Sequence, residues 1–280
     1  MVTRIHCNGY KDKLLIVTLR NKYNNKLNMS RLRNKVAVIT GGNSGIGFGI
    51  AQEFKNEGAK GVIVGRNQKT LDSSVAQLGD NFIAINADVT NLADLERVFK
   101  ETSEKFGKID VIVANAGGGT VGTVADIGEA DFDKAIDLNL KSVYFTVQKA
   151  LPHMNDGGSI ILIGSNAAHR AYANFTLYGA AKAAVIYFAK GFSSDLLDRR
   201  IRANVITPGT TDTPAFDKFV PAEQIEAVKT HFASVMPTGR IGQPSDIGKT
   251  AVFLASDDSS FMLGAELLVD GGMTYLSPTK

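Results

Sequence analysis

The sequence predicts one doubly wound α/β domain, in which a parallel sheet of seven strands is covered by helices on both faces. From residue 35 onward, short apolar runs alternate with longer amphipathic stretches, and no polar linker interrupts them. The short runs are apolar at nearly every position, which is typical of parallel strands buried on both faces. The chain has 280 residues, 44% hydrophobic and 21% charged, and this balance excludes a mainly disordered protein.

The predicted strands are apolar runs of three to six residues, at 36–39, 62–64, 82–85, 109–113, 159–163, 201–206 and 267–269. Helical periodicity predicts helices from the first glycine-rich turn to about residue 56, and over 67–78, 91–106, 131–151 and 176–197. Residues 210–237 are the least regular part of the body, with several proline and aromatic residues. We expect them to form an apolar lid over a site, or a helical pair packed on its own core.

The basic surplus of the chain is confined to its first 28 residues, which hold six basic residues and one acidic residue. The other 252 residues have a net charge of −2, so the body has no basic surface to indicate nucleic acid or an anionic membrane. We expect residues 29–280 to form the catalytic domain. Residues 1–28 are predicted to be an extension that is not native or is disordered, and a targeting or partner-binding arm is the alternative.

Three further classes are excluded by composition. No apolar run approaches the roughly 20 residues of a membrane-spanning helix. A single cysteine cannot form an internal disulfide, which argues against a stapled secreted scaffold. The four histidines do not occur at ligand spacing, so we expect no metal site. A cytoplasmic protein is the resulting expectation.

A glycine-rich turn at residues 40–47 joins the first predicted strand to its helix. Glycine permits positive φ in such a turn and lets a pyrophosphate approach the helix N-terminus. A Walker loop is excluded because Phe48 follows where lysine is required. A merely tight connection is the alternative, but the position after the first strand favours a bound dinucleotide. The predicted binding residues here are Gly41, Asn43, Ser44, Gly45, Ile46 and Gly47.

The order of motifs along the chain resembles the branch of the short-chain dehydrogenase/reductase family that has about 250 residues. The TGxxxGIG turn at 40–47 is followed by Asn115-Ala116-Gly117, Ser165, the Tyr178-x-x-x-Lys182 pair and Pro208-Gly209. The resemblance covers residues 32–275. It implies a Rossmann-type fold, an NAD(P)-dependent oxidoreductase acting on CH–OH groups, and a homotetramer or homodimer.

Tyr178 and Lys182 are four residues apart on a predicted helix, so they share one face. A neighbouring ammonium favours the phenolate and is expected to lower the tyrosine pKa. The resemblance implies that Tyr178 exchanges the proton, that Ser165 orients the substrate oxygen, and that Asn139 and Lys182 reload the tyrosine. Tyr178 and Lys182 are also expected to contact the cofactor. A hydrolase is disfavoured because Ser165 lacks a GxSxG elbow.

The residues at the end of the second predicted strand indicate which cofactor is preferred. Gly65 stands where relatives that select NAD usually carry Asp, and Arg66 follows it. A guanidinium can pair with two oxygens of a 2′-phosphate, so NADP(H) is preferred and NAD(H) is possible. The alternative for Arg66 is an ordinary exposed loop residue, and for Asp88 a turn residue. The remaining cofactor contacts that the resemblance implies are Asp88, Val89, Asn115, Ala116, Gly117, Pro208, Gly209, Thr211 and Thr213.

The expected substrate pocket is mostly apolar and comprises Gly118, Ser165, Ala167, Phe175 and Phe216. This composition favours a neutral carbonyl or alcohol substrate. A 3-oxoacyl-carrier-protein reductase and a glucose-type sugar dehydrogenase are alternatives of the same class. A non-catalytic module that senses a dinucleotide is the alternative of another class, and Asn139, Ser165, Tyr178 and Lys182 argue against it.

Overall fold

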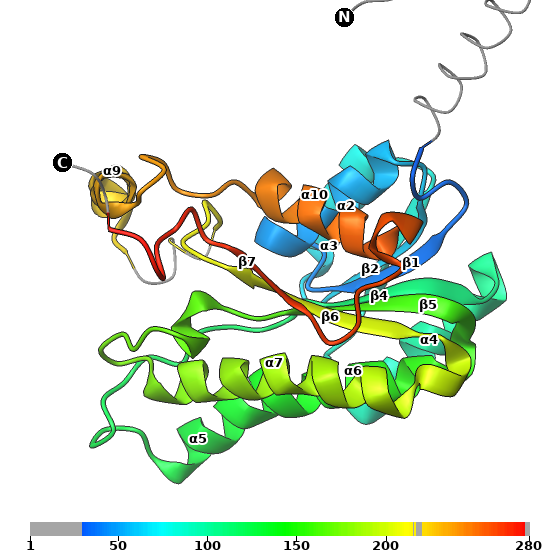
Figure 1. Ribbon diagram of the computed structural model, residues 1–280, viewed down its shortest axis with the longest axis horizontal. Helices are drawn as coiled ribbons and strands as arrows, with labels where there is room; N and C mark the ends of the chain where they lie inside the picture. Colours follow the sequence, from blue (N-terminus) through cyan, green and yellow to red (C-terminus); the bar gives the residue numbers. More distant parts are fainter. Residues whose placement is uncertain (1–29, 215, 217–219, 278–280) are drawn as a thin grey trace, which may run out of the picture.

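One parallel sheet organises the computed structural model, which describes residues 30–214, 216 and 220–277. Its seven strands lie in the order β3-β2-β1-β4-β5-β6-β7, and helices cover both faces (Figure 1). The predicted fold class is therefore confirmed. The expectations for residues 1–28 lie outside the described residues.

All seven predicted strands are present and pair in parallel. They are β1 Val36–Thr40, β2 Lys60–Gly65, β3 Phe82–Asn86, β4 Ile109–Ala114, β5 Met154–Ile163, β6 Arg202–Pro208 and β7 Glu266–Val269. The sequence underestimated β5 most, because residues 155–158, which follow its first residue Met154, are polar or glycine and interrupt the apolar run.

Two groups of helices bury the two faces of the sheet. Helices α2 Gly45–Asn56, α3 Gln68–Leu78 and α10 Pro244–Ala255 pack on one face. Helices α4 Leu92–Phe106, α6 Ser142–Ala150 and α7 Thr176–Asp195 pack on the other. Figure 1 shows these two layers above and below the strands. This covering explains why the strands are apolar on both sides.

The helix predicted over 131–151 is interrupted in the structure. It consists of α5 Glu129–Ile136, a π-helical turn Asp137–Lys141 and α6. Helix α9 Ile225–Val235 lies in the stretch expected to be irregular. Helix α10 was not predicted, although Gln243, Pro244 and Asp246 form a capping box with proline in the first turn.

Arg202, at the start of β6, ties the sheet to the end of α10. Its buried guanidinium donates to the backbone carbonyls of Leu254, Ser256 and Ser259 and to the Ser259 hydroxyl, at 2.8–3.2 Å. Carbonyls at a helix C-terminus have no partner within the helix, so the cation satisfies them and complements the helix dipole. In the described part of the chain, no helix has both the length and the apolar character needed to cross a membrane.

The strand order places a crevice beside β1. The chain passes from β1 to β2 and β3 on one side and then returns to β4 on the other. The connections on the two sides of β1 therefore diverge at the carboxyl ends of β1 and β4. Open α/β sheets bind ligands at such a reversal of strand order.

Candidate active site

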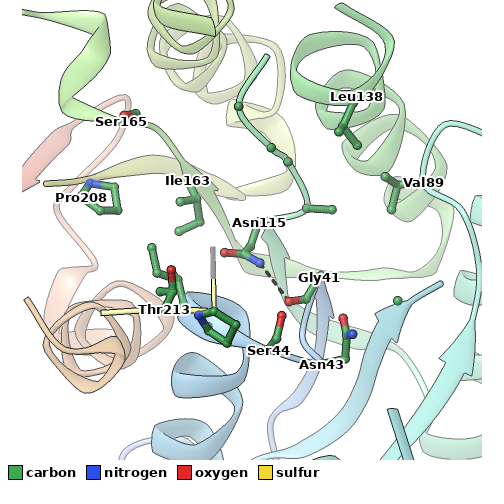
Figure 2. A pocket seen from close by; sticks show the side chains of 18 of the residues that line it. Gly41, Asn43, Ser44, Val89, Asn115, Leu138, Ile163, Ser165, Pro208 and Thr213 are labelled. Carbon is green, nitrogen blue, oxygen red and sulfur yellow. Dashed lines mark hydrogen bonds between the residues drawn. The ribbon is translucent and has the colours of Figure 1, made fainter. Parts of the chain in front are cut away.

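A cavity of about 680 Å³ opens at the carboxyl ends of the strands. Segments that follow β1, β2, β3, β4, β5 and β6 all line it, together with Tyr178 and Lys182 of α7. Figure 2 shows Asn43 and Ser44 of the glycine turn on one side and Ile163 and Pro208 from β5 and β6 on another. The cavity therefore brings together residues that are far apart in the sequence.

The glycine turn has the backbone conformation that the sequence predicted. Gly41 and Gly45 have φ of +63° and +52°, in the left-handed region. A Cβ on Gly47 would lie 2.3 Å from the Gly41 carbonyl oxygen and 2.5 Å from Asn115 Nδ2. Gly47 does not line the cavity, and its missing side chain instead allows the turn to close on β4. Helix α2 begins at Gly45 with no acidic residue in its first turn, so its N-terminus can attract an anion.

Asn115 joins the ends of β1 and β4. Its Nδ2 donates to the carbonyl oxygens of Thr40, at 2.9 Å, and Gly41, at 3.2 Å, and Figure 2 marks the Gly41 bond. The backbone amides of Asn115 and Ala116 donate to Thr40 Oγ1 at 3.0 and 3.1 Å. Thr40 was missed as a site residue, although it opens the TGxxxGIG motif. These bonds fix the turn against the opposite wall of the cavity.

The far end of the cavity combines Asn43, Gly65, Arg66 and Asp88. A guanidinium nitrogen of Arg66 lies 3.5 Å from the Asp88 carboxylate, and the Arg66 side chain is 71% exposed. Burial alone would raise the pKa of Asp88, but hydrogen bonds from Thr90 and the charge on Arg66 hold it below its ordinary value. Asp88 therefore acts as a turn residue, which was the alternative prediction for it. It also lines the cavity.

Asn43 lies directly over Gly65. Its Nδ2 donates to Thr70 Oγ1 at 2.7 Å, and its backbone carbonyl oxygen accepts from Ser74 Oγ at 3.1 Å. A Cβ on Gly65 would lie 2.4 Å from Asn43 Oδ1. Side chains at both positions cannot coexist in this arrangement, so Asn43 occupies the space that an acid at position 65 would need.

Lys182 is buried beside Tyr178. Its Nζ donates to the Ile163 carbonyl oxygen at 2.8 Å and lies 5.7 Å from the centre of the Tyr178 ring. Burial lowers the pKa of Lys182 to about 8. Burial also raises the pKa of Tyr178 above its ordinary value, and the nearby Ser165 hydroxyl only partly opposes this. The expectation that Lys182 lowers the Tyr178 pKa was wrong for this structure, because desolvation of the phenolate dominates.

Ser165 begins the short helical turn η3 Asn166–Ala168, which follows β5. Its Oγ accepts from the Ala167 amide at 3.2 Å. A Cβ on Gly179 would lie 2.6 Å from the Ala167 carbonyl oxygen, so this turn packs directly on α7 next to Tyr178. Ala167 thus supports the serine through its backbone and does not line the cavity.

Asn139 is fully buried in the π-helical turn. Its Oδ1 accepts from the Gly118 amide and its Nδ2 donates to the Ala135 carbonyl oxygen, both at 3.0 Å. A Cβ on Gly117 would lie 3.0 Å from Asn139 Oδ1 and 3.5 Å from Lys182 Nζ. Asn139 therefore does not line the cavity but holds the adjacent glycine segment against the lysine. Departures from α-helical geometry often occur at functional sites.

Most predicted site residues line this cavity, and five do not: Gly47, Asn139, Ala167, Thr211 and Phe216. Thr211 is buried and donates to the Gly209 carbonyl oxygen at 3.1 Å. The Phe216 ring packs edge-on against Phe232, 6.2 Å away. Lining residues that the sequence did not single out include Val64, Asn67, Ala87, Leu138, Gly164 and Pro214. These residues belong to no motif, and only the topology indicates them.

Comparison with known proteins identifies the family to which this chain belongs. Residues 41–274 match the family described as enoyl-(acyl carrier protein) reductase. The oxidoreductase asL5 of Sarocladium schorii is 40% identical over 250 residues, which cover 89% of this chain and 99% of that protein. The chain belongs to the short-chain dehydrogenase/reductase family. It is therefore an oxidoreductase of this family, whose members use NAD(H) or NADP(H).

Two other family members are similar to this chain, one in sequence and one in three-dimensional structure. The hydroxynaphthalene reductase-like protein Arp2 of Metarhizium majus is 35% identical, with 86% of this chain and 95% of that protein covered. A crystal structure of a short-chain dehydrogenase/reductase described as glucose/ribitol dehydrogenase, from Brucella melitensis, superposes with a TM-score of 0.82 at 31% identity. The superposition covers 88% of this chain and 99% of the Brucella melitensis chain.

The residues of the cavity fit a nicotinamide dinucleotide. The glycine turn leaves room for phosphates at the N-terminus of α2, which offers unpaired amides to them. Lys182 and Tyr178 lie at the other end, beside Ile163 and Pro208. The geometry thus separates an end that favours an anion, at the N-terminus of α2, from an end with the acid–base groups Tyr178 and Lys182.

Proposed function

We propose that this protein is an NADP(H)-dependent oxidoreductase that interconverts a carbonyl and an alcohol on a small, mostly apolar substrate. The observation that carries the proposal is the grouping of Ser165, Tyr178 and a fully buried Lys182 in the cavity that also contains the glycine turn. A nicotinamide bound in this cavity would supply the hydride for the carbonyl carbon, or would accept it in the reverse direction.

The side chains of this site provide the proton. Tyr178 keeps its proton at neutral pH because burial raises its pKa, so it serves as the acid that protonates the substrate oxygen. Ser165, which lines the same cavity as Tyr178, donates to the same oxygen and stabilises its developing charge. Lys182 reloads the tyrosine, and its pKa near 8 suits proton exchange close to neutral pH. Asn139 keeps the glycine segment against Lys182, and its further part in the relay is a proposal from the family resemblance.

The preference for NADP(H) rests on the residues at the far end of the cavity. Arg66 provides an exposed guanidinium there, and Gly65 provides no carboxylate to repel a 2′-phosphate. NAD(H) is the alternative cofactor, because Asp88 already pairs with Arg66 and a phosphate must compete with it.

The substrate end favours an apolar compound over a sugar. The lining of the cavity includes Gly118, Gly119, Leu138 and Phe175, which offer no side-chain hydrogen-bonding groups. The Phe175 ring meets the Tyr178 ring edge-on at 6.2 Å. A polyol buried there would leave several hydroxyls without partners, at a cost of about 1–3 kcal/mol each. A cyclic or aromatic ketone fits better, while a glucose-type sugar and a 3-oxoacyl carrier-protein thioester remain the alternative substrates.

We propose a homodimer or homotetramer assembled through α6 and α7. These helices lie side by side on one face of the molecule (Figure 1). Tyr144, Phe188 and Phe192 form an aromatic cluster across them, with ring centres 5.3–5.7 Å apart. Tyr187 on α7 is 70% exposed, and aromatic surface of this kind suits a subunit interface. The cytoplasmic location stays a prediction from the sequence.

The first test is turnover of NADPH and NADH with a panel of ketones, aldehydes, β-ketoesters and quinones. We expect NADPH to be oxidised, and Tyr178→Phe to lower the rate about 10²–10⁴-fold while cofactor binding is retained. Tyr144→Phe removes a hydroxyl from an exposed ring and is the matched control. Cofactor binding with no turnover of any carbonyl would favour the sensing module, and no binding of either cofactor would refute the site assignment.

A further inference from the structure

We infer that Glu266 is a positioning residue, which sets the position of Ser165 relative to the end of β6. Its catalytic consequence rests on the proposed function. Glu266 is the first residue of the edge strand β7 and does not line the cavity. Its side chain nevertheless connects two segments that do.

A single oxygen of Glu266 makes both connections. Glu266 Oε1 accepts from Thr207 Oγ1 at 2.5 Å and lies 2.6 Å from His169 Nε2. Because a carboxylate can only accept, the proton between Glu266 and His169 belongs to Nε2. Thr207 is fully buried, whereas the side chains of Glu266 and His169 are 22% and 26% exposed. The carboxylate therefore links a buried hydroxyl to a histidine near the surface.

The first connection is to the strand end that leads to Pro208 and Gly209. Thr207 is the penultimate residue of β6. Its Oγ1 lies 2.8 Å from the point where Gly164 would carry a Cβ, and the Gly164 amide donates to the Ile206 carbonyl oxygen at 2.8 Å. The hydroxyl bound by Glu266 is thus in contact with the residue directly before Ser165.

The second connection is to the far end of the serine turn. His169 directly follows the turn Asn166–Ala168, and its amide donates to the Asn166 carbonyl oxygen at 3.0 Å. Ser165 starts this turn and its Oγ accepts from the Ala167 amide. Moving His169 therefore moves the turn that fixes the Ser165 hydroxyl.

These contacts differ from an ordinary surface ion pair, which contributes little to stability. Lys182 holds the start of the serine segment through the Ile163 carbonyl, and Glu266 holds its end through His169. Hydride transfer needs the reacting atoms aligned, and a displacement of about 1 Å can cost about 10²-fold in rate. Glu266 is therefore expected to affect kcat more than cofactor binding.

The test compares Glu266→Ala, Glu266→Gln and the control Glu96→Gln. Glu96 forms a pair with Lys149 at 2.5 Å that joins α4 to α6 away from the serine turn. We expect Glu266→Ala to lower kcat about 10-fold, with the cofactor Kd unchanged. Glu266→Gln keeps an oxygen acceptor for both donors and should recover most of kcat, and Glu96→Gln should match the wild type. A kcat that is unchanged in Glu266→Ala, or that falls equally in Glu96→Gln, would overturn the inference.

Amide hydrogen exchange of residues 164–171 gives a readout that needs no turnover. Exchange should rise in Glu266→Ala and in Thr207→Val, which removes one donor at nearly constant volume, and it should not rise in Glu96→Gln. If the wild type reduces no carbonyl but exchange rises as expected, the proposed function fails and the positioning role stands. If exchange is unchanged in both variants, the positioning role fails whatever the activity. Thr207→Val keeps the test decisive should Glu266→Ala not fold.

Discussion

Replacing Gly65 by aspartate tests the assignment of the cofactor-selecting end of the cavity. A carboxylate at the end of β2 would bind the adenosine ribose hydroxyls and repel a 2′-phosphate. The structure adds an obstacle, because the new Cβ would lie 2.4 Å from Asn43 Oδ1. Asn43 must therefore swing away and lose its bond of 2.7 Å to Thr70. The double variant Gly65→Asp/Asn43→Ala removes this conflict.

The two effects have different magnitudes and act on different quantities. The introduced carboxylate would pair with Arg66, and losing a charge-assisted bond from Arg66 to a 2′-phosphate costs about 1.5–3 kcal/mol. At about 1.4 kcal/mol per tenfold, the ratio of kcat/KM for NADPH to that for NADH should fall roughly 10- to 100-fold. The broken bond from Asn43 to Thr70 costs about 0.5–1.5 kcal/mol. This second cost weakens the binding of both cofactors equally. It therefore leaves the ratio of kcat/KM for NADPH to that for NADH unchanged.

The assay is the initial rate with each cofactor, followed by the absorbance of the reduced nicotinamide. We expect Gly65→Asp to lower the preference ratio and to impair both cofactors, and the double variant to recover NADH activity. Asn43→Ala alone is the control and should keep the wild-type ratio. An unchanged ratio in both variants that carry the introduced carboxylate would refute the roles given to Gly65 and Arg66.

Three further predictions concern buried polar groups. Lys182 titrates near pH 8 when folded and near 10.5 when unfolded, so only the unfolded chain binds this proton between those values. The free energy of unfolding should therefore rise with pH over this interval, by up to about 3 kcal/mol, and urea titrations of Lys182→Met should lack this rise. Arg202→Met removes a buried cation that donates to three carbonyls near the end of α10, and it should destabilise the protein by about 1.5–3 kcal/mol, measured by urea unfolding. Asn139→Ala strands the Gly118 amide and the Ala135 carbonyl. It should cost about 1–3 kcal/mol per group in the same measurement, and unchanged stability would contradict its role as a brace.

The sheet was predictable because parallel strands buried on both faces consist of apolar runs. The π-helical turn Asp137–Lys141 was not, because its side chains fit an ordinary helical pattern and only the backbone bonds reveal it. Helix α10 was not predicted although Gln243, Pro244 and Asp246 carry its start signal, because the stretch before it, residues 210–237, has no regular pattern to which the helix could be joined. Sequence signals were thus sufficient to predict a strand or helix wherever the apolar pattern matched the side that is buried.

The composition of the candidate site was predictable to the extent that motifs contain it. The direction of the Tyr178 pKa was not, because spacing on a helix shows that Lys182 is near but not how deeply both groups are buried. Residues such as Leu138 line the cavity only because β4 and the π-helical turn approach each other in space. Sequence spacing contains no information on such contacts.

The geometry divides the motif residues into those that reach a ligand and those that hold the backbone. Asn115 and Asn139 use their side-chain amides to bind carbonyls and amides of neighbouring segments. Ser165 and Tyr178 instead present hydroxyls to the cavity. Loss of either asparagine should therefore lower activity and the free energy of unfolding together, whereas Tyr178→Phe should lower activity alone. The substrate walls proposed above are glycine, leucine and phenylalanine, so we expect that they can change without disturbing the contacts that Asn115 and Asn139 make.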